Sequence, residues 1–189
     1  MKQLYGTADG RVVIKEMPSP TLHGEGAIVQ PKFSAISIGT EGTMLRERRD
    51  GVADSHTTKG FDTTSRGREK PDPVAKDLAL GYSNVGVILE TSPELDGFRP
   101  GDTVTCAGGG FASHAQQCYV PRNLLAHCPA HVDLREAAFT TLGACAMQGL
   151  RRGRVELGET VAVIGLGMLG QLSVQMAKAA GARVVAVDW

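Results

Sequence analysis

The sequence has no excess of charge of either sign, because 20 Lys and Arg residues balance 20 Asp and Glu residues across its 189 positions. Such a chain has no overall field that would attract nucleic acid or an anionic membrane. Aromatic residues are also scarce, at 5%, whereas glycine occurs 24 times. Many glycines with few aromatics are typical of short strands joined by tight turns. We therefore expect a β-rich protein that acts on a small molecule and has neither nucleic acid nor a membrane as a partner.

Paired cysteines are absent too. No C-x-x-C motif joins any two of the four cysteines, which are Cys106, Cys118, Cys128 and Cys145. The usual sequence signals of a zinc ribbon or a redox centre are therefore missing, and we expect buried thiols in a reducing compartment. The first six residues hold no apolar signal-peptide core. The longest uncharged run, residues 160–177, is interrupted by three glycines, which argues against a membrane span. The sequence therefore predicts a cytoplasmic location.

The most informative segment is a glycine-rich turn between two apolar runs. Residues 159–164 read as a strand, residues 171–180 as a helix, and residues 183–188 as a second strand that ends in an acid. A G-x-G-x-x-G turn in that setting is typical of dinucleotide binding, with pyrophosphate on the free N–H groups of the helix N-terminus. Asp188 stands near the usual offset of about 20 residues, where a carboxylate binds a ribose diol and repels a 2′-phosphate. We predict NAD as the cofactor, with NADP disfavoured. The predicted cofactor-binding residues are Gly165, Leu166, Gly167, Met168, Leu169, Gly170 and Asp188.

Only two strands of this nucleotide-binding sheet precede the last residue, Trp189. A complete domain of this kind has about six parallel strands. Two strands and one helix leave a parallel edge open and one face of the sheet uncovered. We expect either a missing C-terminal segment or a second copy of the chain, as in a homo-oligomer, to supply the remaining strands.

The preceding part of the chain consists of short apolar runs separated by Gly, Pro and polar turns, which predict a partly open β-barrel. The expected strands lie at residues 10–16, 26–38, 86–90, 100–106, 115–121 and 123–128. Asp133 followed by Glu136 predicts a capped helix start. Residues 46–77 carry almost no apolar periodicity, so we expect a long surface loop there, either a solvated insertion or a substrate lid or partner-binding segment.

Several stretches resemble the medium-chain dehydrogenase/reductase superfamily in order and spacing. They are residues 33–41, 80–88, 100–104, 142–146 and 157–165. A finer likeness, at residues 108–114, 121–124 and 137–143, is to the N-terminal half of bidomain oxidoreductases of bacterial polysaccharide synthesis. The resemblance implies an α/β chain in which a GroES-like catalytic domain, residues 1–145, precedes an incomplete Rossmann domain. Residues 146–189 would be the first βαβ unit of its doubly wound parallel sheet. The resemblance also implies hydride transfer to or from a nicotinamide.

The chain departs from the superfamily at its zinc ligands. Alcohol dehydrogenases of this superfamily bind catalytic zinc through a C-x-[ST]-D motif, a Gly-His-Glu motif and a later Cys or carboxylate. The corresponding positions here hold Ile38, then Tyr82 and Ser83, and finally Thr141 or Leu142. Isoleucine and leucine have no donor atom for zinc, which needs three protein ligands. We therefore predict no zinc and no metal-binding residues.

Two hydroxyl side chains are the predicted catalytic residues. Tyr82 occupies a former ligand position and can donate a hydrogen bond to a substrate oxygen. Thr40 lies where the resemblance implies a hydroxyl in the proton-relay path. Glu41 is expected to orient nearby backbone or to pair with an arginine, and Ser83 to leave space for substrate. The histidines lack metal-ligand spacing and are expected to be structural or exposed; those in the barrel are His114, His127 and His131.

The resulting prediction is an NAD(P)-dependent, zinc-free oxidoreductase that transfers a hydride between a nicotinamide and an alcohol or carbonyl group, with a sugar-related substrate. A quinone or enoyl reductase is the first alternative, because hydride addition to carbon lets solvent supply the proton. A catalytically inactive binding or assembly module is the second, because part of the cofactor site is missing from the chain.

Overall fold

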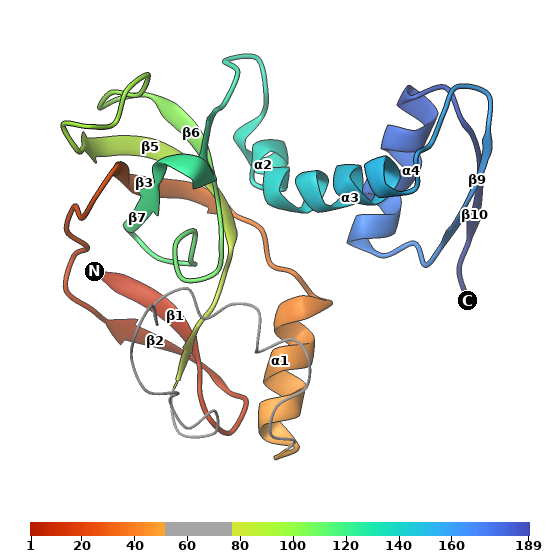
Figure 1. Ribbon diagram of the computed structural model, residues 1–189. Coiled ribbons are helices and arrows are strands. Elements are labelled where there is room, and N and C mark those ends of the chain that lie inside the picture. Colours follow the sequence, from red (N-terminus) through yellow and green to blue (C-terminus); the bar gives the residue numbers. More distant parts are fainter. Residues whose placement is uncertain (52–76) are drawn as a thin grey trace. The chain divides into compact units, whose positions relative to one another are not determined.

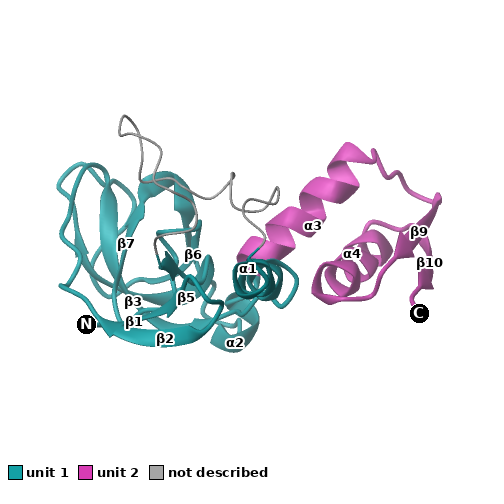
Figure 2. Ribbon diagram, turned by 90° about the horizontal axis from the view of Figure 1, so that it is seen from below, with its two compact units in different colours: residues 1–139 teal, residues 140–189 magenta. Residues whose placement is uncertain are grey.

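The computed structural model describes residues 1–51 and 77–189 (Figure 1). Contacts group the chain into two compact units, residues 1–139 and residues 140–189 (Figure 2). Unit 1 contains two antiparallel sheets, and unit 2 contains a parallel pair of strands with two helices. The predicted fold class, an antiparallel barrel-like domain followed by a βαβ unit, is confirmed.

The larger sheet of unit 1 has five antiparallel strands in the order β7-β3-β5-β6-β8. They are β3 (Gly26–Ser34), β5 (Ser83–Thr91), β6 (Thr103–Ala107), β7 (Cys118–Pro121) and β8 (Leu125–His127), with a 3₁₀ turn, η1 (Arg122–Leu124), before β8. The core lies against this sheet, and Val29, Ile88 and Val104 are almost fully buried in it. These strands correspond to the apolar runs from which they were predicted.

A smaller sheet has the order β2-β1-β4 and comprises β1 (Lys2–Gly6), β2 (Val12–Glu16) and β4 (Leu78–Ala79). Sequence patterning identified β2 but missed β1, which alternates poorly, and β4, which has two residues. Backbone hydrogen bonds tie β1 to the segment 114–116: the Leu4 N–H donates to the His114 carbonyl, and the Gln116 N–H donates to the Lys2 carbonyl. The smaller sheet is thereby held beside His114.

Helix α1 (Thr40–Arg49) corrects one prediction. Residues 46–49, predicted to begin a long surface loop, form the last turn of this helix, whereas residues 52–76 lie outside the described residues. The helix was missed because it buries only one apolar side chain, Met44, besides Glu41. One buried apolar residue is too few to produce a helical period in the sequence.

Helix α2 (Leu134–Ala137) begins as predicted at Asp133, whose side chain accepts a hydrogen bond of 2.7 Å from the Arg135 N–H. In unit 2, α3 (Thr140–Arg152) precedes β9 (Thr160–Ile164), α4 (Met168–Ala179) and β10 (Arg183–Val187). Strands β9 and β10 pair in parallel over five residue pairs, from Thr160–Arg183 to Ile164–Val187. This is the predicted strand–turn–helix–strand unit.

The four thiols differ in exposure. Cys106 and Cys118 are buried as predicted, and burial raises the pKa of Cys118 to about 11. The prediction is wrong for Cys145, which is exposed on α3, while Cys128 is partly exposed. In the part of the chain that the structure describes, no helix combines the length and apolar character that crossing a membrane requires.

Candidate functional site

The glycine-rich turn of unit 2 is shaped by two of its glycines. Gly165 has a φ of +92°, which favours glycine, and its N–H donates to the Val187 carbonyl at 2.8 Å. A Cβ atom at Gly170 would lie 1.9 Å from the Gly165 carbonyl oxygen. The chain itself therefore requires glycine at both positions.

Gly167 has a different environment, because a Cβ atom there would meet no atom within 4 Å. It is the N-cap residue of α4, and no side chain caps this helix end. The first N–H groups of a helix lack partners within it and, with the helix dipole, attract anions. The open space beside Gly167 and the N-terminus of α4 therefore fit the pyrophosphate of NAD(P).

Asp188 lies beside the same turn. One carboxylate oxygen accepts a hydrogen bond of 2.7 Å from the Leu166 N–H, and the other accepts one of 2.8 Å from the Trp189 N–H. The bond from Leu166, and then that from Trp189, lowers the pKa of Asp188 below its usual value. The structure thus brings an ionised, exposed carboxylate to the edge of the turn.

Unit 1 contains a buried polar cluster around Glu41, a residue only 5% exposed. Its Oε2 accepts a hydrogen bond of 2.7 Å from the Ser37 N–H, and its Oε1 accepts one of 3.0 Å from the Gly81 N–H. His114 Nε2 lies 3.0 Å from the same Oε1. Glu41 therefore does orient nearby backbone, but its side-chain partner is a histidine rather than an arginine.

The cluster continues through His114 to the end of β3. His114 Nδ1 lies 2.8 Å from Ser34 Oγ. Gly81 permits this arrangement: its φ is +93°, and a Cβ atom there would lie 2.5 Å from the His114 backbone nitrogen. Three polar side chains, Ser34, His114 and Glu41, are thus connected in series; they form what we call the Ser–His–Glu cluster.

The charge of Glu41 is maintained by its hydrogen bonds. Burial raises the pKa of this carboxyl, but the hydrogen bonds from His114, Ser37 and Gly81 outweigh burial and hold the pKa below its usual value. Carboxylates that accept several N–H groups remain ionised for this reason. The cluster therefore contains a buried negative charge at neutral pH.

The predicted catalytic residues flank this cluster. Thr40 is partly buried in the first turn of α1, next to Glu41, and Tyr82 is partly buried next to Gly81. The hydrogen bond from the Gly81 N–H to Glu41 therefore joins the two segments that carry Thr40 and Tyr82. The chemical roles of Thr40 and Tyr82 stay predictions.

The positions that correspond to zinc ligands hold side chains that do not fit zinc. Ile38 is 75% exposed and has no donor atom. Ser83 is 1% exposed, and its Oγ donates a hydrogen bond of 2.6 Å to the Ala138 carbonyl, so it holds α2 against β5 rather than leaving space for substrate. Leu142 is buried in α3. Among residues 1–51 and 77–189, no three His, Cys, Asp or Glu side chains gather into a potential metal site.

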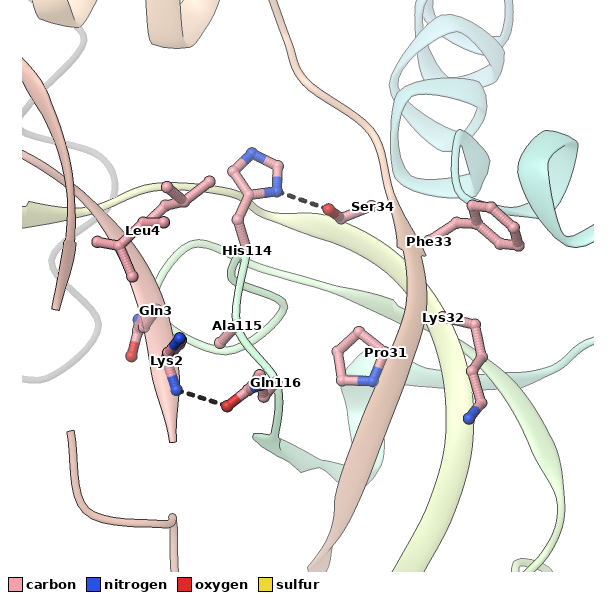
Figure 3. Close-up of a pocket in the computed structure, with 11 residues that line it drawn as sticks. Lys2, Gln3, Leu4, Pro31, Lys32, Phe33, Ser34, His114, Ala115 and Gln116 are labelled. Carbon is pink, nitrogen blue, oxygen red and sulfur yellow. Dashed lines mark hydrogen bonds between the residues drawn. The ribbon is translucent and has the colours of Figure 1, made fainter. Parts of the chain in front are cut away.

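An open pocket of about 300 Å³ lies between β1 and β3 of unit 1 (Figure 3). Residues 2–4 of β1 form one wall, residues 31–34 of β3 form the other, and residues 114–116 lie between them. Figure 3 shows the Ser34 and His114 side chains pointing toward each other at one end of the pocket. The Ser–His–Glu cluster therefore ends at a cavity large enough for a small molecule.

Sequence reasoning did not find this cluster. Ser34 and His114 are 80 residues apart, and His114 and Glu41 are 73 apart. No motif spacing links residues at such separations. His127, by contrast, behaves as expected of a structural histidine, since its Nε2 contacts the Gly97 carbonyl 2.8 Å away.

No protein-family model matches the chain. Among curated proteins, D-guloside 3-dehydrogenase of Escherichia coli is 27% identical over 186 residues, which cover 98% of this chain and 53% of that protein. Sorbitol dehydrogenase of Halalkalibacterium halodurans is 27% identical over 194 residues, covering 87% of this chain and 54% of that protein. The chain spans about half the length of the curated relatives it matches.

Solved structures give the same result for the fold. An alcohol dehydrogenase superfamily protein from Novosphingobium aromaticivorans has a TM-score of 0.77 and 26% identity, over 100% of this chain and 53% of that one. The Escherichia coli quinone oxidoreductase complexed with NADPH has a TM-score of 0.74 and 16% identity, over 98% of this chain and 52% of that one. The chain is thus similar in sequence to about half of each of these dehydrogenases, and in sequence and fold to about half of a protein of the alcohol dehydrogenase superfamily.

Proposed function

We propose that this chain forms the barrel-like domain and the start of the coenzyme-binding domain of an NAD(P)-dependent oxidoreductase. The reaction is hydride transfer between a nicotinamide and an alcohol or carbonyl group of a small molecule. The observation that carries this proposal is the turn between β9 and α4, where open space at Gly167 meets an uncapped helix N-terminus beside Asp188.

NAD is the proposed coenzyme in preference to NADP. The pyrophosphate would lie on the N–H groups at residues 168–170, in the first turn of α4, and the Asp188 carboxylate would accept hydrogen bonds from the adenosine ribose diol. An ionised carboxylate repels a 2′-phosphate. The position of Asp188 supports this preference, because its carboxylate, charged at neutral pH, is held at the turn by the Leu166 N–H.

We further propose that the chemistry proceeds without zinc, because the positions of the zinc ligands hold Ile38, Tyr82 and Ser83, and Thr141 or Leu142, which supply no suitable ligand set. Tyr82 would then donate a hydrogen bond to the substrate oxygen, and Thr40 would relay the proton of the substrate hydroxyl group. When bound, the nicotinamide supplies a two-electron hydride acceptor or donor. The chain's own residues bind the substrate and handle the proton.

The proposed substrate is a sugar or a polyol. Support comes from the names of two relatives, a D-guloside 3-dehydrogenase and a sorbitol dehydrogenase. The finer resemblance to bidomain oxidoreductases of bacterial polysaccharide synthesis points to the same class. A cytoplasmic location and completion of the parallel sheet, by a further segment or a second copy, belong to this proposal.

A quinone or enoyl reductase is the alternative within the same class. The fold similarity to a quinone oxidoreductase favours it, and hydride addition to carbon needs no strong protein acid. An inactive binding or assembly module is the alternative from another class, favoured by the apolar surface of the two-stranded sheet, where Ile164 and Val185 are exposed.

Coenzyme binding tests the proposal first. NADH fluorescence is titrated with the 189-residue chain, and we expect saturable binding. The same titration with NADPH should give a higher Kd. Oxidation of sorbitol and of a glycoside with NAD is then compared with reduction of a benzoquinone by NADH. Quinone reduction without polyol oxidation would establish the first alternative, and absence of saturable NADH binding would leave only the inactive module.

A further inference from the structure

The pocket between β1 and β3 carries different polar groups at its two ends. Ser34 and His114 lie together at one end, and Figure 3 shows Gln116 at the other end of the same wall. Residues 114–116 pair with β1, so this segment is extended. Its two polar side chains are therefore carried by positions up to about 7 Å apart, which is a separation that a small ligand can bridge.

The Ser34 end presents a hydrogen-bond acceptor. Glu41 is ionised, and an ionised carboxylate only accepts, so His114 Nε2 carries the proton that it shares with Glu41 Oε1. In a neutral imidazole, the other nitrogen then has a lone pair, and His114 Nδ1 accepts the hydrogen bond of 2.8 Å from the Ser34 O–H. The lone pairs of Ser34 Oγ, on an exposed residue of β3, are thus available to a donor such as a ligand hydroxyl group.

The Gln116 end presents hydrogen-bond donors. Gln116 Oε1 accepts a hydrogen bond of 2.8 Å from the Lys2 N–H, which fixes the orientation of the amide and makes Nε2 the group that it offers to a ligand. Lys2 lines the same pocket and adds an ammonium group. A carboxylate accepts hydrogen bonds from both kinds of donor, and those from an ammonium group are the stronger ones.

The charges of the lining residues also favour an anion. Two of the eleven described residues that line the pocket are lysines, Lys2 and Lys32, and none is Asp or Glu. Glu16 stands opposite Lys2 in the register of β1 and β2, but it is not among the lining residues. The walls between the two polar ends are apolar and include Leu4, Ile14 and Pro31. The pocket therefore suits a ligand with an apolar body, a negative charge and one further polar group.

We propose that this pocket binds a small hydroxycarboxylate, whose carboxylate accepts hydrogen bonds from Gln116 Nε2 and the Lys2 ammonium group while its hydroxyl group donates to Ser34 Oγ. The reverse orientation would bring the carboxylate toward the buried charge of Glu41, which repels it. A pocket of about 300 Å³ is large enough for such a molecule. The two predicted catalytic residues do not line the pocket, so the inference does not depend on the proposed function.

Three related probes test the assignment by NMR titration of the ¹⁵N-labelled chain, followed at the Gln116 side-chain amide and the backbone amides of residues 114–116. We expect 4-hydroxyphenylacetate to shift these resonances saturably. Its uncharged amide, 4-hydroxyphenylacetamide, should bind about tenfold more weakly or worse, because it loses hydrogen bonds to a charged group. Phenylacetate, which has no hydroxyl group, should bind about threefold more weakly. Absence of saturable shifts, or equal affinity for the uncharged amide, would overturn the proposal.

Variants of the lining residues test the orientation of the ligand. Lys2→Gln should weaken binding of 4-hydroxyphenylacetate about fivefold, whereas Lys178→Gln, which removes the same charge from an exposed position on α4, should leave it unchanged. Ser34→Ala should bind 4-hydroxyphenylacetate and phenylacetate equally well. Equal losses in the two lysine variants, or a preference for the hydroxyl group that persists in Ser34→Ala, would overturn the proposal.

The amide spectrum of each variant shows whether unit 1 keeps its fold. These titrations contain no NADH, so their failure leaves the proposed function standing, and failure of the NADH titration leaves this pocket standing.

Discussion

Replacement of Gly167 by alanine separates coenzyme binding from folding at the glycine-rich turn. Gly167 has φ −64° and ψ −171°, extended values that alanine adopts readily, and its added Cβ meets no atom of the protein within 4 Å. We therefore expect the free energy of unfolding to change by less than about 1 kcal/mol. The same methyl group occupies the space into which the pyrophosphate would come.

The expected loss of affinity follows from the hydrogen bonds that the methyl group displaces. A hydrogen bond to a charged group contributes about 1.5–3 kcal/mol. Loss of one such bond converts into NADH binding that is about 10- to 150-fold weaker. Gly170→Ala gives no such separation, because its Cβ would lie 1.9 Å from the Gly165 carbonyl oxygen and disturb the turn itself.

The assay combines NADH fluorescence titration with urea unfolding. Gly149→Ala is the matched control, since it also lies in unit 2 and its Cβ meets nothing within 4 Å. We expect that control to bind NADH like the unmodified chain. Wild-type affinity in a stably folded Gly167→Ala variant would refute the placement of the pyrophosphate, and so would an equal loss in Gly149→Ala.

Three further measurements test the roles of Asp188, Glu41 and Ser83. Asp188→Ser should reduce the preference for NADH over NADPH, because the repelling carboxylate is gone; the ratio of the two Kd values measures this, and an unchanged ratio would contradict the assignment. The lowered pKa of Glu41 means that the unfolded chain binds a proton more readily than the folded chain. The free energy of unfolding, measured by urea titration at a series of pH values, should thus decrease from about pH 5 to pH 3. In the Glu41→Gln variant this decrease should be smaller. Ser83→Ala leaves the Ala138 carbonyl without its donor and should cost about 1–2 kcal/mol in the same experiment; an unchanged midpoint would show that this bond contributes nothing.

The βαβ unit could be predicted from the sequence because its signals are local. Two apolar runs flank a turn in which Gly165 and Gly170 are required by backbone geometry, and Asp188 follows directly after the second run. Each of these features lies within a single stretch of about 30 residues, the usual length of such a unit. The antiparallel strands of the larger sheet were predicted for the same reason, from alternation and turn residues.

The polar cluster could not be predicted because tertiary folding assembles it. Ser34, Glu41 and His114 come from three elements, and nothing near any of them in the sequence marks a partner. Helix α1 was missed for a related reason: buried hydrogen bonds to Glu41, rather than an apolar stripe, hold its first turn in place. Hydrophobic periodicity detects only helices that are held by apolar burial.

The uneven exposure of the thiols provides a natural labelling position. Alkylation requires an accessible thiolate, and burial raises the pKa of Cys118 to about 11 and that of Cys106 further still. A maleimide dye at neutral pH will therefore attach first to Cys145 on α3 and leave the core of unit 1 unmodified. The unaltered sequence can thus carry a fluorescent reporter on the unit that holds the glycine-rich turn.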